Sequence, residues 1–295
     1  LSIMATPRLP CVLILICVIE SFVQPNAVGQ TPNDARVQDR LSALESNPDD
    51  HPVFLLRLFK FKGDSDRATF RRYLQVSLGR IRELGGEVIF YGKANPFEID
   101  FTGSEKVFGF RPCPWDRIVL ERYGSRIDIR KLGESTAYAQ AMVDLESSLA
   151  ETVVYALNGS PWSGGTQRSK ADAVTGPPKP PTPNQAVYML NLLAFKPGGQ
   201  KIYLQQYARA VMPLITQTHR GEVIYGLKTE QLLIGPEEYD RVILVMYPSA
   251  DAFTDMLLSD AYQEVSHYRT SAISIGHLYA FSNEAAELQS MMDSK

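Results

Sequence analysis

The 295-residue sequence has few cysteines, no long hydrophobic run and no excess of one charge. With 30 basic and 33 acidic residues its formal net charge is −3, which indicates no basic surface for nucleic acid or for an anionic membrane. Glycine-rich nucleotide-binding loops and the GxSxG motif of serine hydrolases do not occur in it. The four histidines lack the spacing of metal ligands, so the sequence predicts no metal site.

The first 29 residues are typical of an export signal. Arg8 precedes an apolar segment, residues 11–19, that is far shorter than the roughly 20 residues that span a bilayer. The small residues Ala27 and Gly29 stand at positions that a signal peptidase reads. A membrane anchor is the alternative. We expect cleavage, a secreted or periplasmic protein, and no membrane attachment afterwards.

Cleavage would remove Cys11 and Cys17 and leave Cys113 alone, so no disulfide could form within the mature chain. The protein must then rely on its hydrophobic core, and 44% hydrophobic residues over this length suffice for two domains. Cys113 stands between two prolines without a CxxC partner, so we expect a structural or loop cysteine.

The residue pattern predicts the order β-α-β-β-α-β for the first half. Residues 53–61 (VFLLRLFKF) are rich in aromatic and branched residues, which is typical of a strand. Residues 66–84 carry apolar residues at helical spacing, and Gly85 and Gly86 then end the helix. The remaining strands are predicted at residues 87–91, 117–123 and 152–157.

The second half repeats this pattern. The segment VYMLNLLAF from Val187 matches VFLLRLFKF from Val53, and GEVIYGLK from Gly221 matches GEVIFYGK from Gly86. Matching segments in the same order predict an internal duplication. The predicted divisions are a signal peptide at 1–29, a polar leader at 30–50, a degenerate first repeat at 51–158, a Pro/Gly/Ser linker at 159–184, a second repeat at 185–282 and a polar tail at 283–295.

Both faces of the predicted strand Val187–Phe195 are largely apolar. Met189 and Leu193 lie on one face, and Leu190 and Leu192 lie on the other. The helices of one repeat can cover only one face of its sheet. We therefore expect the sheet of the other repeat to cover the second face, which makes the chain a monomer that acts as a pseudo-dimer. Pairing with a second chain is the alternative.

These segments resemble a known superfamily. The MLNLLAFK opening, the GEVIYG strand and YDRVILVMYPSADAF followed by SDAYQ look like the dimeric α/β-barrel superfamily of ferredoxin-like domains, and more narrowly like an uncharacterised bacterial domain family within it. The resemblance covers residues 187–281 well and residues 53–157 loosely. It implies an α+β fold of two ferredoxin-like β-α-β-β-α-β repeats, packed sheet to sheet as an intramolecular α/β barrel. It implies little about function.

Within this superfamily the chain also resembles haem-degrading monooxygenases. Those enzymes use an asparagine on the first strand, a tryptophan on the third strand and a haem-ligating histidine on the last helix. Asn191 and Tyr247 fall at the first two of these positions. Ser266 falls at the third, and His267 follows it about 100° further around the helix. We therefore predict no haem and no other cofactor.

A ligand site is expected in the second repeat. Asn191 is an amide on an apolar strand, and its burial costs about 1–3 kcal/mol unless it is hydrogen-bonded. Its partner is either a neighbour, such as Tyr262 or Arg269, or a ligand. The first repeat has Arg57 at this position and apolar residues at the positions of Ser266 and His267, so it is expected to lack the site.

Three functions are left open, and whether the protein is an enzyme is among the open points. The first is the binding of a small, mostly apolar molecule without turnover. The second is a cofactor-independent monooxygenase or isomerase with His267 as general base. The third is a structural or partner-binding protein without a ligand. For the first two, the expected site residues are Asn191, Tyr247, Tyr262, Ser266, His267 and Arg269.

Overall fold

The computed structural model describes residues 32–49, 51–63, 67–96, 112–159 and 186–293. The predicted signal peptide and nearly all of the predicted linker lie outside these residues. The fold is mixed α+β with antiparallel strands, as the sequence predicts.

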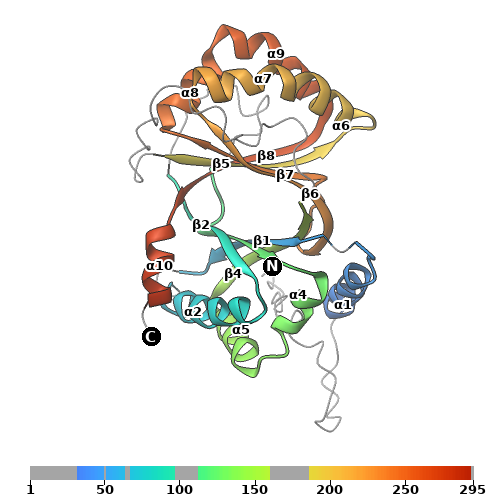
Figure 1. The fold of residues 1–295 in the computed structure, drawn as a ribbon, viewed down its shortest axis with the longest axis vertical. Helices are drawn as coiled ribbons and strands as arrows, with labels where there is room; N and C mark the ends of the chain where they lie inside the picture. The colour runs from blue at the N-terminus through green and yellow to red at the C-terminus, as the bar shows by residue number, and fades with distance from the viewer. Residues whose placement is uncertain (1–31, 50, 64–66, 97–111, 160–185, 294–295) are drawn as a thin grey trace, which may run out of the picture.

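Eight strands close into a barrel in the order β1-β3-β2-β8-β5-β7-β6-β4 (Figure 1). The strands are β1 (Val53–Phe61), β2 (Glu87–Ala94), β3 (Arg117–Tyr123), β4 (Leu149–Asn158), β5 (Val187–Phe195), β6 (Glu222–Ile234), β7 (Arg241–Tyr247) and β8 (Ile273–Asn283). The strand order is β4-β1-β3-β2 in the first half and β8-β5-β7-β6 in the second. The halves join at two seams, where β4 pairs with β6 and β2 pairs with β8.

Helices cover the outside of the barrel on two opposite sides, below it for the first half and above it for the second in Figure 1. The first half has α1 (Pro32–Glu45), α2 (Arg67–Glu83), α4 (Arg126–Leu132) and α5 (Thr136–Ser148). The second half has α6 (Gly199–Ile202), the π-helical turn η3 (Tyr203–Tyr207), α7 (Ala208–Pro213), the π-helical turn η4 (Leu214–Thr218), α8 (Ala250–Leu258) and α9 (Asp260–Ala272). The last helix, α10 (Ala285–Asp293), returns to the side of the first half.

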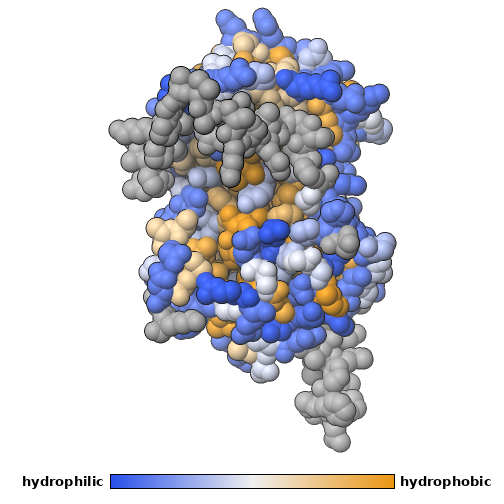
Figure 2. Space-filling model, in the orientation of Figure 1, coloured by the Kyte–Doolittle hydropathy of each residue, from blue (hydrophilic) through white to orange (hydrophobic). Residues whose placement is uncertain are grey.

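The core has three apolar layers, and this arrangement explains why both faces of the strands are apolar. Met189 and Leu193 pack beneath the helices of the second half. Leu190 and Leu192 point into the barrel, where they join Leu56 of β1 in one cluster built from both halves. Figure 2 shows hydrophobic side chains gathered at mid-height, between the two helical layers.

The predicted polar leader and polar tail contain helices that bury apolar side chains. Val37 and Leu41 of α1 belong to the same buried cluster as Leu233 of β6. Leu288 and Met291 of α10 are buried in that cluster as well. The apolar residues of α1 are few among many polar ones, so composition alone conceals the packing of this helix. In the described part of the chain, no helix has the length and apolarity needed to cross a bilayer.

Candidate functional site

A cavity lies between the sheet of the second half and the helices that cover it. Its volume is about 50 Å³, measured as the space open to the centre of a water molecule. Asn191 and Val245 lie on its sheet side, and Tyr207 of η3 with Tyr262 and Arg269 of α9 lie on its helix side. The volume is well below the roughly 300–1,000 Å³ of drug-sized ligand sites, so only a small molecule fits.

The local sequence fixes the helices that hold these side chains. The hydroxyl of Ser249 accepts a hydrogen bond from the Ala252 amide and caps the N-terminus of α8. The hydroxyl of Ser259 does the same for α9 by accepting from the amide of Tyr262, at 3.2 Å. The second cap ends α8 and begins α9 at Ser259, which places Tyr262 in the first turn of α9, facing the sheet.

The helix opposite α9 approaches it unusually closely. A Cβ atom at Gly199 would collide with the carbonyl group of Ala272, so glycine is required where α6 begins. The π-helical turn η3 follows directly and brings Tyr203 and Tyr207 to the cavity. Single π-helical turns within α-helices are frequent at functional sites.

Asn191 borders the cavity and is only half-buried. Its Nδ2 atom lies 3.4 Å from the carbonyl oxygen of Met189 and 3.5 Å from that of Ile243. Both distances exceed the usual 2.7–3.2 Å of an N–H···O hydrogen bond, so the amide protons are weakly satisfied. Among the described residues, neither Tyr262 nor Arg269 is its hydrogen-bond partner.

The cavity also contains phenols that stay protonated. The hydroxyls of Tyr207 and Tyr262 lie 3.2 Å apart and share a hydrogen bond. Burial raises the pKa of Tyr247, and it raises the pKa of Tyr262 despite the opposing effect of Arg269. At neutral pH these side chains therefore act as neutral donors and acceptors.

Of the described residues that line the cavity, Arg269 is the one with a charged side chain. It is 6% exposed, and its Nη2 atom is buried without a hydrogen-bond partner. Burial by itself lowers the pKa of the guanidinium, but the neighbouring phenols of Tyr262 and Tyr207 more than offset this, and the pKa is raised. The cavity thus contains a permanent positive charge with an unused N–H donor.

The structure brings together four of the six expected site residues. Asn191, Tyr247, Tyr262 and Arg269 all line the cavity. Ser266 and His267 do not. The Ser266 hydroxyl donates to the carbonyl of Gln263, and His267 is exposed with its Nδ1 2.9 Å from the carbonyl of Glu264. One residue along a helix is a rotation of about 100°, so His267 is turned out of the inward-facing side of α9 and points away from the sheet.

The described residues that line this cavity do not include the haem-ligating histidine that the resembling monooxygenases use. The volume of the cavity is about 50 Å³. At the position of their iron ligand stands Ser266, whose hydroxyl is bonded within its own helix. Elsewhere in the described ranges, no cluster of three or more His, Cys, Asp or Glu side chains could hold a metal ion.

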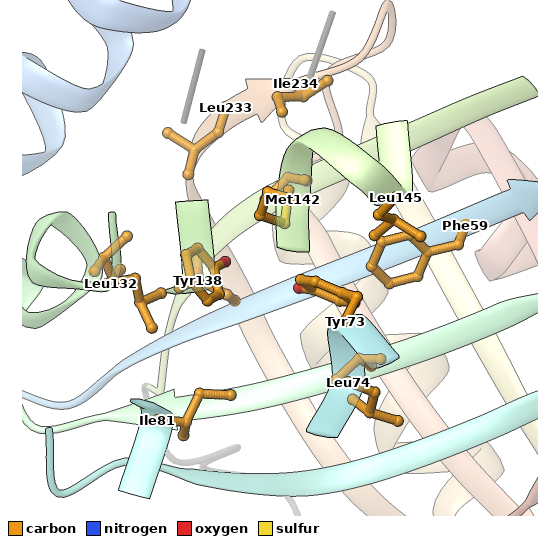
Figure 3. Close-up of a cluster of buried hydrophobic side chains, with 14 of the residues drawn as sticks. Phe59, Tyr73, Leu74, Ile81, Leu132, Tyr138, Met142, Leu145, Leu233 and Ile234 are labelled. Atoms are coloured by element: carbon orange, nitrogen blue, oxygen red, sulfur yellow. The ribbon is translucent and has the colours of Figure 1, made fainter. Parts of the chain in front are cut away.

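The first half has a polar network at the corresponding place, which the sequence does not predict. Arg57 of β1 and Glu121 of β3 form an ion pair with 3.1 Å between Nε and Oε1, and both side chains are 1% exposed. Nη2 of Arg57 donates to the hydroxyl of Tyr138 at 3.2 Å, and the hydroxyl of Tyr123 donates to Glu121 at 2.7 Å. Figure 3 shows the hydroxyls of Tyr73 and Tyr138 pointing toward each other across this region. The first half therefore has polar side chains at this place that pair with one another within the protein.

Sequence reasoning also missed Tyr203 and Tyr207. They stand four residues apart and are followed at the same interval by Val211 and Ile215, which also line the cavity. This interval is typical of the core-facing side of a helix. It does not indicate that Tyr203 and Tyr207 line a cavity rather than a filled core.

Comparison with known families finds a match for most of the second half. Residues 199–280 match the profile of a domain of unknown function, DUF1330. This part of the chain is a DUF1330 domain. The match begins after β5, so Asn191 lies just before it, whereas Tyr207, Val245, Tyr262 and Arg269 lie within it. No curated protein matches the sequence.

Some solved structures resemble about a third of this chain, and others resemble most of it. A protein of unknown function from Rhodopseudomonas palustris is 29% identical over 33% of this chain and 82% of its own, with a TM-score of 0.31. An anthrone oxidase-like protein is 11% identical over 80% of this chain and 92% of its own, with a TM-score of 0.50. A mutant chlorite dismutase from Candidatus Nitrospira defluvii is 11% identical over 85% of this chain and 100% of its own, with a TM-score of 0.45. At 11% identity, the likeness to the anthrone oxidase-like protein informs on fold alone.

Proposed function

We propose that this protein binds a small, mostly apolar molecule in the cavity of its DUF1330 domain and does not convert it. The observation that carries this proposal is the combination of a cavity with two donors at its border. The Asn191 amide is weakly satisfied by the protein, and Nη2 of Arg269 has no partner. Buried donors are normally satisfied, and a ligand would satisfy these two. Apolar side chains such as Ile243 and Met256 make up most of the remaining lining.

Binding is favoured over the cofactor-independent monooxygenase or isomerase because the described lining of the cavity lacks a base. Proton abstraction requires a group with a pKa near the working pH, commonly a histidine or a carboxylate. The described side chains that line the cavity include neither. His267, the expected base, is exposed on the outer face of α9.

The two halves are proposed to be duplicated ferredoxin-like repeats that pair within one chain. The identical strand orders and the equivalent registers of the β1–β3 and β5–β7 pairs support this interpretation. In this arrangement both seams of the barrel are closed internally, so the protein would be a monomer, and light scattering during size-exclusion chromatography measures this directly. We further propose that the chain is exported before it functions.

The test of binding is mass spectrometry of small molecules released from the purified full chain, with Asn191→Leu as the main variant. Leucine has nearly the shape of asparagine but no amide, so retention should fall while the fold persists. Ser266→Ala and His267→Ala are matched controls outside the cavity and should retain the molecule. If wild-type protein releases none and no small molecule raises its melting temperature, the chain has a structural or partner-binding role instead.

A further inference from the structure

The cavity of the second half lies where the first half has its internal ion pair. The sheet registers define this correspondence. Glu121 pairs with Leu55 of β1, two residues before Arg57, and Val245 pairs with Met189 of β5, two residues before Asn191. The carboxylate position of the first half is therefore Val245 in the second half, and the guanidinium position is Asn191.

The second half supplies a guanidinium from a different element. Arg269 is the tenth residue after the N-cap Ser259 of α9, and the tenth residue after the N-cap Ser135 of α5 is Leu145. Leu145 is fully buried in the apolar cluster of the first half. The second half thus contains the positive charge of the first-half network but has no carboxylate at the position of Glu121.

A buried guanidinium without a counter-charge is unfavourable, because removing a charge from water costs several kcal/mol that only pairing and hydrogen bonds repay. Two of the other four buried arginines in the described ranges follow this rule. Arg57 pairs with Glu121, and Arg126 pairs with Glu230 at 2.6 Å. Among the described residues, no carboxylate pairs with Arg269 and no acceptor is bonded to its Nη2 atom.

We propose that the ligand of this cavity is a short-chain organic monocarboxylate, which supplies the carboxylate that the second half lacks. This assignment rests on the proposed binding function and specifies its ligand class. The carboxylate would accept hydrogen bonds from Nη2 of Arg269 and from the amide of Asn191. Its short chain would lie against Val245 and Ile243 of the sheet. The cavity leaves about 50 Å³ for the centre of a water-sized group, which suits a small molecule such as acetate or propionate.

The test is calorimetric titration of the full chain with sodium acetate, propionate and benzoate, and with the neutral amide propionamide. Acetate or propionate should bind, propionamide should bind at least about tenfold more weakly, and benzoate should be excluded by its size. Arg269→Met should weaken propionate binding at least about tenfold, because it removes the charge and retains a long apolar side chain. Arg117→Met is the matched control, since Arg117 is a buried arginine that does not line the cavity, and it should bind propionate as wild type does.

A second pair of variants decides the matter if Arg269→Met does not fold. Val245→Glu places a carboxylate where the first half has Glu121, so it should raise the melting temperature above that of Val245→Gln and abolish propionate binding. The neutral glutamine fills the same space without pairing with Arg269. Equal melting temperatures for the two variants would overturn the proposed role of the Arg269 charge.

The outcomes separate the ligand class from the binding function. If propionamide binds as tightly as propionate and Arg269→Met has no effect, the protein binds a neutral molecule, and only the carboxylate assignment is overturned. If chloride or phosphate alone, at equal ionic strength, binds as tightly as propionate, the site is for an inorganic anion, and the organic assignment is again overturned. If no probe binds and no small molecule co-purifies, the proposed function itself fails.

Discussion

The guanidinium of Arg57 and the carboxylate of Glu121 form an ion pair that is sealed inside the first half, with 3.1 Å between Nε and Oε1 and both side chains 1% exposed. Burial by itself lowers the pKa of Arg57, and the Glu121 carboxylate more than offsets this, so the pKa is raised well above its ordinary value. The guanidinium therefore stays charged at any pH at which the protein is folded.

The first prediction follows from this pair. Arg57→Met should lower the free energy of unfolding by about 3–5 kcal/mol, because it leaves the Glu121 carboxylate buried without a counter-charge. Urea denaturation measures the change. The double variant Arg57→Met/Glu121→Leu removes both charges and should recover most of the loss. A double variant that is no more stable than the single one would show that packing, rather than the charge, decides the effect.

The second prediction concerns Arg126 of α4, which joins the segment between α1 and β1 to β6. Its Nε and Nη2 atoms donate to the two carboxylate oxygens of Glu230 on β6, both at 2.6 Å, and its Nη1 donates to the backbone of Asp49. Arg126→Met should cost about 3 kcal/mol and accelerate amide hydrogen exchange in residues 36–49.

Arg130→Met is the matched control for that variant. Arg130 pairs with Glu45 at 3.6 Å, and its side chain is 43% exposed, so its loss should cost less than about 1 kcal/mol. If both variants speed exchange in α1 equally, the Arg126 cluster has no special role in holding this helix.

The third prediction compares two glycines. A Cβ atom at Gly199 would collide with the carbonyl group of Ala272, so Gly199→Ala should destabilise the protein by about 1–3 kcal/mol and disturb the cavity. Gly79 lies within α2, and a Cβ atom there would meet open space, so Gly79→Ala should stabilise by about 0.5–1 kcal/mol through helix propensity. Thermal denaturation followed by circular dichroism gives both values, and the same sign for both variants would contradict this explanation.

The fourth prediction is a loss of stability at high pH. Burial raises the pKa of Tyr91 and of Tyr203 from 10.0 to about 12, and that of the Cys113 thiol from 9.0 to about 12. Between the two values the unfolded chain releases these protons and the folded chain retains them. Stability should therefore be constant below about pH 9 and fall progressively from there to about pH 12.

The measurement is the melting temperature as a function of pH, together with the ultraviolet absorbance of phenolate. The buried tyrosines should ionise only as the chain unfolds. Ionisation of all tyrosines near pH 10 in a chain that is still folded would contradict the predicted burial. The thiol of Cys113 should likewise react slowly with alkylating reagents below pH 9.

Much of the fold follows from local residue patterns. The segments 53–61 and 187–195 are strands with the predicted bounds, because aromatic and branched residues along them favour extended backbone with both faces buried. The interruption between α8 and α9 is visible in the sequence as the cap Ser259. The side chains of Tyr262 and Arg269 stand seven residues apart on α9, which puts them on one face of a helix.

What the sequence could not provide are contacts between elements far apart in the chain. The Arg57–Glu121 pair depends on the register between β1 and β3, and the contact of Tyr207 with Tyr262 depends on how two helices approach each other. The sequence alone determined the elements, their inward faces and the residue types available for a site, because these depend on periodicity over a few residues. Only the tertiary structure decided which charges are paired. In the first half Glu121 pairs with Arg57, whereas within the described residues no carboxylate lies beside Arg269. The reason is that packing determines which groups a buried charge meets.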